Sequence, residues 1–574
     1  MVDLVVRGGT VVDGSGGSAA VADVAVDGGR VVEVGPGLGP ARRTIDAEGR
    51  IVCPGFVDLH THYDVQAFWD PALSPSPLHG ITTVVGGNCG FSVAPLAEGG
   101  ADYLLHMLAR VEGMPVDALQ LACDWGWRSF GDYLGRLEGT LGPNAGFLVG
   151  HSALRRAVMG AAACERAADP AETAAMADLL GRSLAEGGLG LSSSLAATHN
   201  DGSGGPVPSR FAEPDELLAL CREVRRHPGT TLEFIPGVGD VSEEQARLMA
   251  GMSAAADRPL NWNVLIVMAG LEEQARRQLG ASDVAEAAGG RVLGLTMPAP
   301  VMPRLSFASG FLLDTIPGWH EVMTAPIGER VAALSSPQRR AELLRSAEEG
   351  GAAFGLANFG QYVLCDIRSE EHARWNGHTV AEAAEALGTT AFDAACDIAL
   401  ADDLEVGLMF PPSGDGRADW EARLAVWRDR RSVIGASDAG AHLDFLATFH
   451  YPTVMLRRAV VDLGLLDWPE AVHLLADRPA RLYGLRGRGR LAAGAHADLV
   501  VIDPARLGPD PVGVRHDLPG GGWRLYAGAS GYDHVLVGGT ALVEHDELTD
   551  ARPGSVLRSG VDTDTVTAAP VPPA

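Results

Sequence analysis

The chain of 574 residues contains no lysine, so all 45 of its basic residues are arginine. This absence excludes a phosphate-binding loop built around a lysine and a catalytic Schiff-base lysine. It also excludes a carbamylated lysine that bridges two metal ions. Any metal site in this protein must therefore be completed by other side chains.

Long apolar runs and paired cysteines are absent as well. The sequence contains no run of about 18 apolar residues, the length that a membrane-spanning helix needs. The N-terminus also lacks the basic and apolar regions of a signal peptide. The seven cysteines are scattered, without a Cys-x-x-Cys pair. Such a pattern is typical of reduced thiols, and we therefore expect a cytoplasmic protein.

Basic residues are fewer than acidic ones: the chain has 73 acidic and 45 basic residues, which give a formal charge of −28. A surface with this charge repels nucleic acids and anionic membranes, so we expect neither as a partner. The expected partner is a small-molecule substrate, and homo-oligomerisation is left open.

Short β-branched segments separated by glycine-rich turns occupy both ends of the chain. This pattern is typical of hairpins. It predicts a small β-sandwich formed by residues 1–52 together with residues 485–558. Residues 559–574, which end in proline and alanine, are expected to be disordered.

The middle of the chain, residues 53–484, alternates short apolar strands with helical stretches. This alternation indicates an α/β protein with parallel strands, and eight strands fit a (β/α)8 TIM-like barrel. Residues 300–430, approximately, are too many for one connection and predict an insertion over the barrel mouth. The strands are expected at 57–60, 82–85, 146–149, 189–192, 230–234, 260–267, 292–296 and 432–436.

Metal-ligand side chains follow several of these strands. His60 and His62 lie two residues apart on an extended segment and so point to the same side. Cys89 follows the second strand and Asp438 the eighth. Imidazole, thiolate and carboxylate are zinc ligands, and a carboxylate can also accept a proton from water. The alternative is that the histidines are ordinary surface residues and that Asp438 caps a helix. The recurrence of ligand-type side chains at one edge of the barrel favours a metal site instead.

The segments around these residues resemble a known family. Residues 54–64, 80–95, 149–155 and 477–503, together with the segment around Asp438, are similar to the amidohydrolase superfamily, and within it to the N-acyl-D-amino-acid deacylase (D-aminoacylase) branch. That branch uses the cysteine of Asn88-Cys89-Gly90 where its relatives use a carbamylated lysine. The resemblance implies a barrel with a β-sandwich, bound zinc, and His60, His62, Cys89 and Asp438 as its ligands.

The fifth and sixth strands depart from the family pattern. In relatives each usually ends in a metal-binding histidine, but residues 230–236 and 259–265 contain none. Glu233, Asn261 and Asn263 are the polar residues in these segments. We therefore expect one zinc ion per chain, with a second left open.

Five further residues are candidates for weaker roles. His151 is either a ligand or oxyanion donor or a structural histidine. Glu233 either replaces the ligand of the fifth strand or pairs with an arginine. Asn263 is better suited to a substrate hydrogen bond than to metal. Arg304 and Arg368 either clamp a substrate carboxylate or are solvated surface charges.

The combined features predict a zinc-dependent amidohydrolase that cleaves an amide C–N bond, with N-acyl-D-amino acids or related small amides as substrates. Zinc polarises a carbonyl and activates water, and Asp438 shuttles the proton. Two alternatives remain: a single-metal enzyme acting on another C–N bond, such as a deaminase or cyclic amidase, and a metal-binding barrel without hydrolytic activity. The acyl group, side chain and stereochemistry of the substrate are left open.

Overall fold

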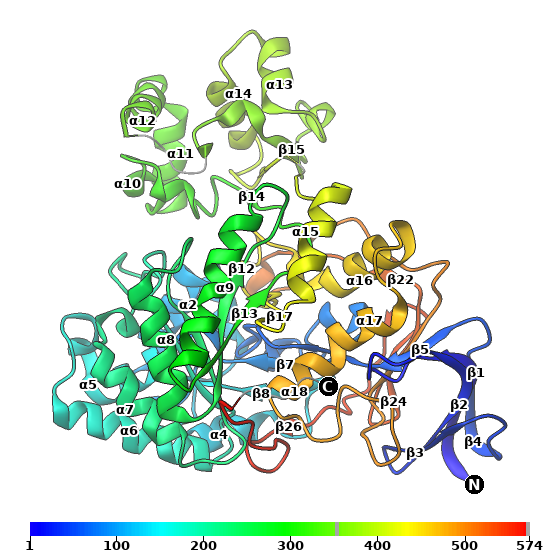
Figure 1. Ribbon diagram of the computed structural model, residues 1–574. Coiled ribbons are helices and arrows are strands. Elements are labelled where there is room, and N and C mark those ends of the chain that lie inside the picture. The colour runs from blue at the N-terminus through cyan, green and yellow to red at the C-terminus, as the bar shows by residue number, and fades with distance from the viewer. Residues whose placement is uncertain (351–354, 412, 570–574) are drawn as a thin grey trace.

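A computed structural model describes residues 1–350, 355–411 and 413–569 (Figure 1). Strands from both chain ends form a sheet on one side of a larger α/β body. A helical lobe, green in Figure 1, stands above that body. Within the described residues, no helix is long and apolar enough to cross a membrane.

The two ends of the chain meet in one nine-stranded mixed sheet. Its order is β25-β24-β23-β18-β5-β1-β2-β3, with β4 paired to β1. β5 runs antiparallel to β18, so that Cys53 lies opposite Val500. Gly28 and Gly29 form the two-residue turn between β2 and β3, with φ of 54° and 74° that glycine adopts without strain. The strands are β1 (Val2–Val11), β2 (Ala20–Asp27), β3 (Arg30–Gly35), β4 (Ala41–Asp46), β5 (Ile51–Pro54), β18 (Leu499–Ile502), β23 (Tyr532–Val537), β24 (Thr540–Glu544) and β25 (Glu547–Leu548).

Parallel strands form the centre of the α/β body. β6, β7 and β8 are neighbours in one sheet, and β9-β10-β11-β12-β13-β17 is the order of another. Only Leu148 separates β8 from β9, and a parallel bridge between Thr61 and Ala439 joins the ends of β6 and β17. The strands thus follow chain order, as in a (β/α)8 barrel. They are β6 (Phe56–Asp58), β7 (Ile81–Gly86), β8 (Asn144–Phe147), β9 (Val149–Gly150), β10 (Gly190–Ser194), β11 (Thr231–Ile235), β12 (Pro259–Leu265), β13 (Arg291–Thr296) and β17 (Ser432–Ile434).

Amphipathic helices connect these strands and pack against their neighbours. Side-chain caps fix where two of them begin: Asp169 accepts hydrogen bonds at the start of α6, and Ser242 does so at the start of α8. The connecting helices include α5 (His151–Met159), α6 (Pro170–Ala185), α7 (Pro214–Val224), α8 (Glu243–Ala256), α9 (Glu272–Ala287) and α15 (Arg417–Trp427). The connection from β7 to β8 contains α2 (Ala101–Val111), α3 (Val116–Ala122) and α4 (Phe130–Leu137).

The lobe above the body lies between β13 and β17 and has its own hydrophobic core. Phe307, Trp319, Phe359 and Phe392 are among the aromatic residues of this core. A three-stranded antiparallel sheet of order β14-β16-β15 connects the lobe to the body. Its elements are β14 (Arg304–Leu305), α10 (His320–Met323), α11 (Ile327–Ser335), α12 (Pro337–Gly350), β15 (Val363–Cys365), α13 (Val380–Leu387), α14 (Ala391–Leu400) and β16 (Gly407–Met409).

The C-terminal segment differs from the expectation of a disordered tail after residue 558. β26 (Val556–Leu557) pairs in parallel with β8 of the body. Beyond it, Thr563 Oγ1 donates to the carbonyl of Gly229 at 2.7 Å, and Arg486 pairs with Asp564 at 2.7 Å. These specific partners order the segment despite its polar composition. Residues 570–574 lie outside the described part of the chain.

Candidate metal centre

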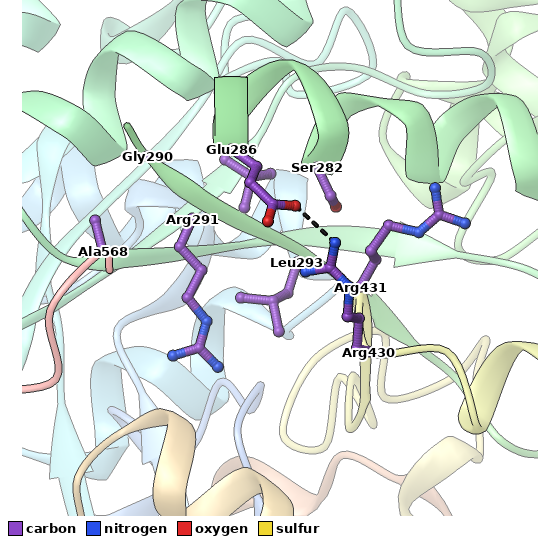
Figure 2. Close-up of a pocket in the computed structure, with 9 residues that line it drawn as sticks. Ser282, Glu286, Gly290, Arg291, Leu293, Arg430, Arg431 and Ala568 are labelled. Atoms are coloured by element: carbon purple, nitrogen blue, oxygen red, sulfur yellow. Dashed lines mark hydrogen bonds and ion pairs between the residues drawn. The ribbon is translucent and has the colours of Figure 1, made fainter. Parts of the chain in front are cut away.

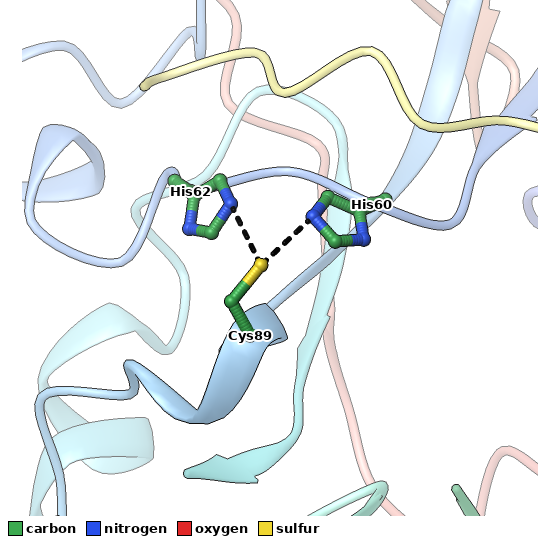
Figure 3. A group of neighbouring side chains, drawn as sticks. All are labelled: His60, His62 and Cys89. Atoms are coloured by element: carbon green, nitrogen blue, oxygen red, sulfur yellow. Dashed lines mark hydrogen bonds between the residues drawn. The ribbon is translucent and has the colours of Figure 1, made fainter. Parts of the chain in front are cut away.

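His60, His62 and Cys89 come together at the carboxyl ends of the first two body strands (Figure 3). Cys89 Sγ is 3.3 Å from His60 Nε2 and 3.8 Å from His62 Nε2. All three residues are buried. Asn88 fixes the turn of Cys89 to the histidine segment, because its amide nitrogen donates to the carbonyls of Thr61 and Val85.

Asp438 faces the same cluster from the end of β17. Its Oδ1 is 3.1 Å from His60 Nε2 and 3.6 Å from His62 Nε2, and its side chain is 34% exposed. Partial burial alone raises the pKa of Asp438, but hydrogen bonds and charge interactions with His60 and His62 outweigh it and hold that pKa well below its ordinary value. The carboxylate is therefore an ionised group that both reaches the cluster and opens toward solvent.

The four side chains fit a zinc ion by their chemistry. Two imidazole nitrogens, a thiol and a carboxylate oxygen are the donor types that zinc binds. Burial, followed by the negative charge of Glu233, raises the pKa of the Cys89 thiol well above its ordinary value. A divalent cation offsets that penalty, because it binds the thiolate. Cys89 and Asp438 also adopt φ of 58° and 51°, a strained conformation of the kind that clusters at functional sites.

Glu233 lies behind the cluster. Its Oε2 accepts a hydrogen bond from the Cys89 amide at 2.8 Å, and its Oε1 is 3.9 Å from His60 Nδ1. Burial raises the pKa of Glu233 to about 8. Of the two alternatives from the sequence, the arginine pair is not among the contacts of the described residues. The carboxyl group instead supports the turn of Cys89 through the backbone hydrogen bond, and its other oxygen faces His60 Nδ1 without a hydrogen bond.

Asn263 lies at the edge of the cluster. Its Nδ2 is 4.0 Å from Cys89 Sγ, and its Oδ1 has no hydrogen-bond partner among the described residues. Asn261, two residues earlier, accepts a hydrogen bond from Tyr483 at 3.0 Å. The side-chain nitrogen of Asn261 also has no partner among the described residues, but it is Asn263 that contacts Cys89, so its free oxygen is the one placed for a substrate contact.

His151 is not part of the cluster. Its Nδ1 is 2.8 Å from Ser193 Oγ, and its Nε2 is 2.7 Å from Glu216 Oε1. Arg155 binds the same carboxylate. Because both ring nitrogens already have partners, His151 has none left to offer to a metal ion or a substrate oxygen, and the structural alternative fits its contacts.

Arg304 and Arg368 also lie apart from the cluster. Arg304 Nε donates to Asp366 at 2.7 Å, and Arg368 pairs with Glu405 at 2.8 Å. Both line a cavity of about 330 Å³ beside Trp523. Both ion pairs lie within the segment between β13 and β17, and they leave neither arginine as a free carboxylate clamp.

Another cavity, of about 90 Å³, lies at the opposite ends of the body strands (Figure 2). Arg291 at the start of β13 and Arg431 just before β17 line it, and Arg430 pairs with Glu286 at 2.6 Å. Catalytic groups of a barrel gather at the carboxyl ends of its strands. This cavity is therefore not the active site.

Three further polar residues near the cluster were not identified from the sequence. Glu112, at the end of α2, places Oε1 3.4 Å from His62 Nδ1 and Oε2 3.9 Å from His442 Nε2. Burial, and then the nearby His442 and His62, lower the pKa of His199 to about 3. The three residues are Glu112, His199 and His442, and none of them belongs to a recognisable motif. The only signal in the sequence was that His442 lies four residues after Asp438.

Comparisons with known proteins identify the family of the chain. The model of the Amidohydrolase family matches residues 43–543. The chain is 27% identical to a D-aminoacylase from Alcaligenes xylosoxydans xylosoxydans, over 97% of each chain. It is 29% identical to an N-acyl-D-glutamate deacylase from the same organism, over 97% of this chain and 96% of the relative. The N-acyl-D-glutamate deacylase of Bordetella bronchiseptica, solved with zinc and a phosphonate inhibitor, has a similar fold with a TM-score of 0.63 at 24% identity, covering 97% of this chain and all of the other.

Proposed function

Because the chain belongs to the amidohydrolase family, we propose that it is a zinc-dependent hydrolase that removes the acyl group from N-acyl-D-amino acids. The single observation that carries this proposal is the position of Asp438, whose Oδ1 is 3.1 Å from a ligand histidine and whose side chain opens to solvent. The relatives named as deacylases support the substrate class. The zinc in the structure of a deacylase with the same fold supports the metal.

The side chains divide the reaction between them. When bound, zinc supplies a Lewis acid for the amide carbonyl and lowers the pKa of a water molecule. His60, His62 and Cys89 would hold the ion. Asp438 accepts the proton of the attacking water and delivers it to the nitrogen of the leaving amino acid. Asn263, whose side-chain oxygen has no hydrogen-bond partner among the described residues, offers that oxygen to a substrate N–H.

The direct test is turnover of a panel of N-acyl amino acids in both stereochemical series, with zinc added or removed by a chelator. The proposal expects free D-amino acid and carboxylic acid as products, and no reaction of the metal-free protein. Release of ammonia or opening of a cyclic amide would instead identify a single-metal enzyme acting on another C–N bond. Zinc binding without turnover of any amide would identify a metal-binding barrel.

We expect purified protein to carry about one zinc ion per chain. The fifth and sixth strands contain no histidine, and Glu233 in the fifth already accepts a hydrogen bond from Cys89. Elemental analysis of extensively dialysed protein measures the number. Two tightly held ions per chain would contradict this expectation and assign Glu233 as a ligand of the second.

Replacing Cys89 with alanine should reduce zinc content and activity together, because the thiolate is a ligand. Cys221 is the matched control: it is equally buried, but it lies in α7 among apolar residues. Cys221→Ala should keep its zinc even if it unfolds at a lower temperature. Full zinc content in Cys89→Ala would place Cys89 in the core and outside the metal centre.

We also propose a cytoplasmic location and a small-molecule amide as the partner. The scattered cysteines, all free in the described residues, support the location. The charge of −28 supports the exclusion of nucleic acid and anionic membranes.

A further inference from the structure

The carboxylate of Glu112 lies on the far side of the His62 ring from the metal centre. Glu112 Oε1 is 3.4 Å from His62 Nδ1. The other ring nitrogen, Nε2, is 3.8 Å from Cys89 Sγ and 3.6 Å from Asp438 Oδ1. The ring therefore has one nitrogen at a carboxylate and the other at the metal centre, which is how carboxylates orient zinc-binding histidines.

The same residue reaches the loop that carries Asp438. Glu112 Oε2 is 3.9 Å from His442 Nε2, and the backbone amide of His442 donates to the carbonyl of Glu112. Within that loop, the amide of Ala441 donates to the carbonyl of Asp438 at 2.9 Å. Glu112 thus contacts a ligand from the first strand and the loop after the eighth.

Rigid packing fixes the position of Glu112. The apolar face of α2, which includes Leu104, Leu108 and Val111, is buried, and the amide of Glu112 donates to the carbonyl of Leu108 at 2.9 Å. The side chain is only 3% exposed. A carboxylate is costly to bury unless cationic or hydrogen-bonding groups compensate, and the two groups facing this one are both histidines of the site.

We propose that Glu112 is a positioning residue, which holds the ring of His62 with Nε2 toward the metal and ties this ligand to the loop of Asp438. The proposal rests on the metal-dependent function proposed above, but it is independent of the substrate. It predicts that Glu112 contributes to zinc affinity and to the geometry of the bound ion without touching either the ion or the substrate.

The test compares Glu112→Gln and Glu112→Ala with Asp102→Asn, a control on the exposed face of the same helix, where the Asp102 side chain is 84% exposed. Zinc affinity is measured by competition with a chromogenic chelator, and the geometry of the centre by the visible absorption of the cobalt-substituted protein. Loss of such a supporting group costs about 10- to 100-fold in metal affinity. We expect a loss in this range for Glu112→Ala, a smaller loss for Glu112→Gln, which keeps an oxygen beside Nδ1 but loses the charge, and no change for Asp102→Asn.

A purely structural role gives a different result. It predicts a lower unfolding temperature for the Glu112 variants, but wild-type zinc affinity and cobalt spectrum in the folded protein, and this outcome would overturn the proposal. If Glu112→Ala fails to fold, Glu112→Gln decides, because it preserves the shape of the side chain. Failure of the substrate panel would leave these metal measurements intact, so the two proposals can fail separately.

Discussion

The Asp438→Asn variant is expected to lose about 100- to 10,000-fold in kcat while most of its zinc stays bound. Asparagine keeps the size of the side chain and one oxygen near His60 and His62, but it cannot accept the proton of the attacking water. The measurement is kcat and zinc content side by side, on whichever amide proves to be a substrate.

Asp283→Asn is a suitable control, because that aspartate is 58% exposed and pairs with Arg431 far from the centre. Near-normal turnover by Asp438→Asn would mean that another group carries the proton, and Glu233 would be the first to examine. Equal loss of zinc and turnover would make Asp438 a ligand only.

The His62→Ala variant is expected to lose zinc first, and all measurable activity with it. The imidazole is buried between Glu112 and the other ligands, so alanine leaves a space that no neighbouring side chain fills with a donor atom. Removal of one ligand from a four-ligand site weakens binding sharply. Zinc content after dialysis and the chelator-competition affinity measure the effect.

His106→Ala provides the comparison, since that histidine is 46% exposed on α2 and is not a member of the cluster. It should retain zinc and activity. Retention of tightly bound zinc by His62→Ala would show that the ion binds elsewhere, and would remove the basis for the role of Glu112 as well.

The clustering of the four candidate ligands could be predicted from the sequence because their positions follow from strand geometry. His60 and His62 share a side of one extended segment through their spacing alone. Cys89 and Asp438 follow other strands, and parallel strands of a barrel bring their carboxyl ends to one face. Strand positions were therefore sufficient to bring four residues together across almost 380 positions of sequence.

The supporting residues could not be predicted in the same way. Glu112 reaches His62 only because of the way α2 packs over the body, and no local pattern encodes that packing. His151 lies after a strand as a ligand should, yet Ser193 and Glu216 occupy both of its nitrogens. Both partners are distant from His151 in sequence. The sequence alone therefore cannot distinguish a metal-binding or substrate-binding His151 from a structural one.

β5 cannot pair with β18 until almost the whole chain has been synthesised. β18 follows β5 by more than 400 residues, and translation at about 5–20 residues per second takes roughly 20 to 90 s to cover that distance. Throughout this interval one edge of β5 exposes unpaired backbone groups on a nascent chain. Such edges are templates for association with other chains. Until β18 has been synthesised, this edge of β5 is therefore a potential site of association between nascent chains.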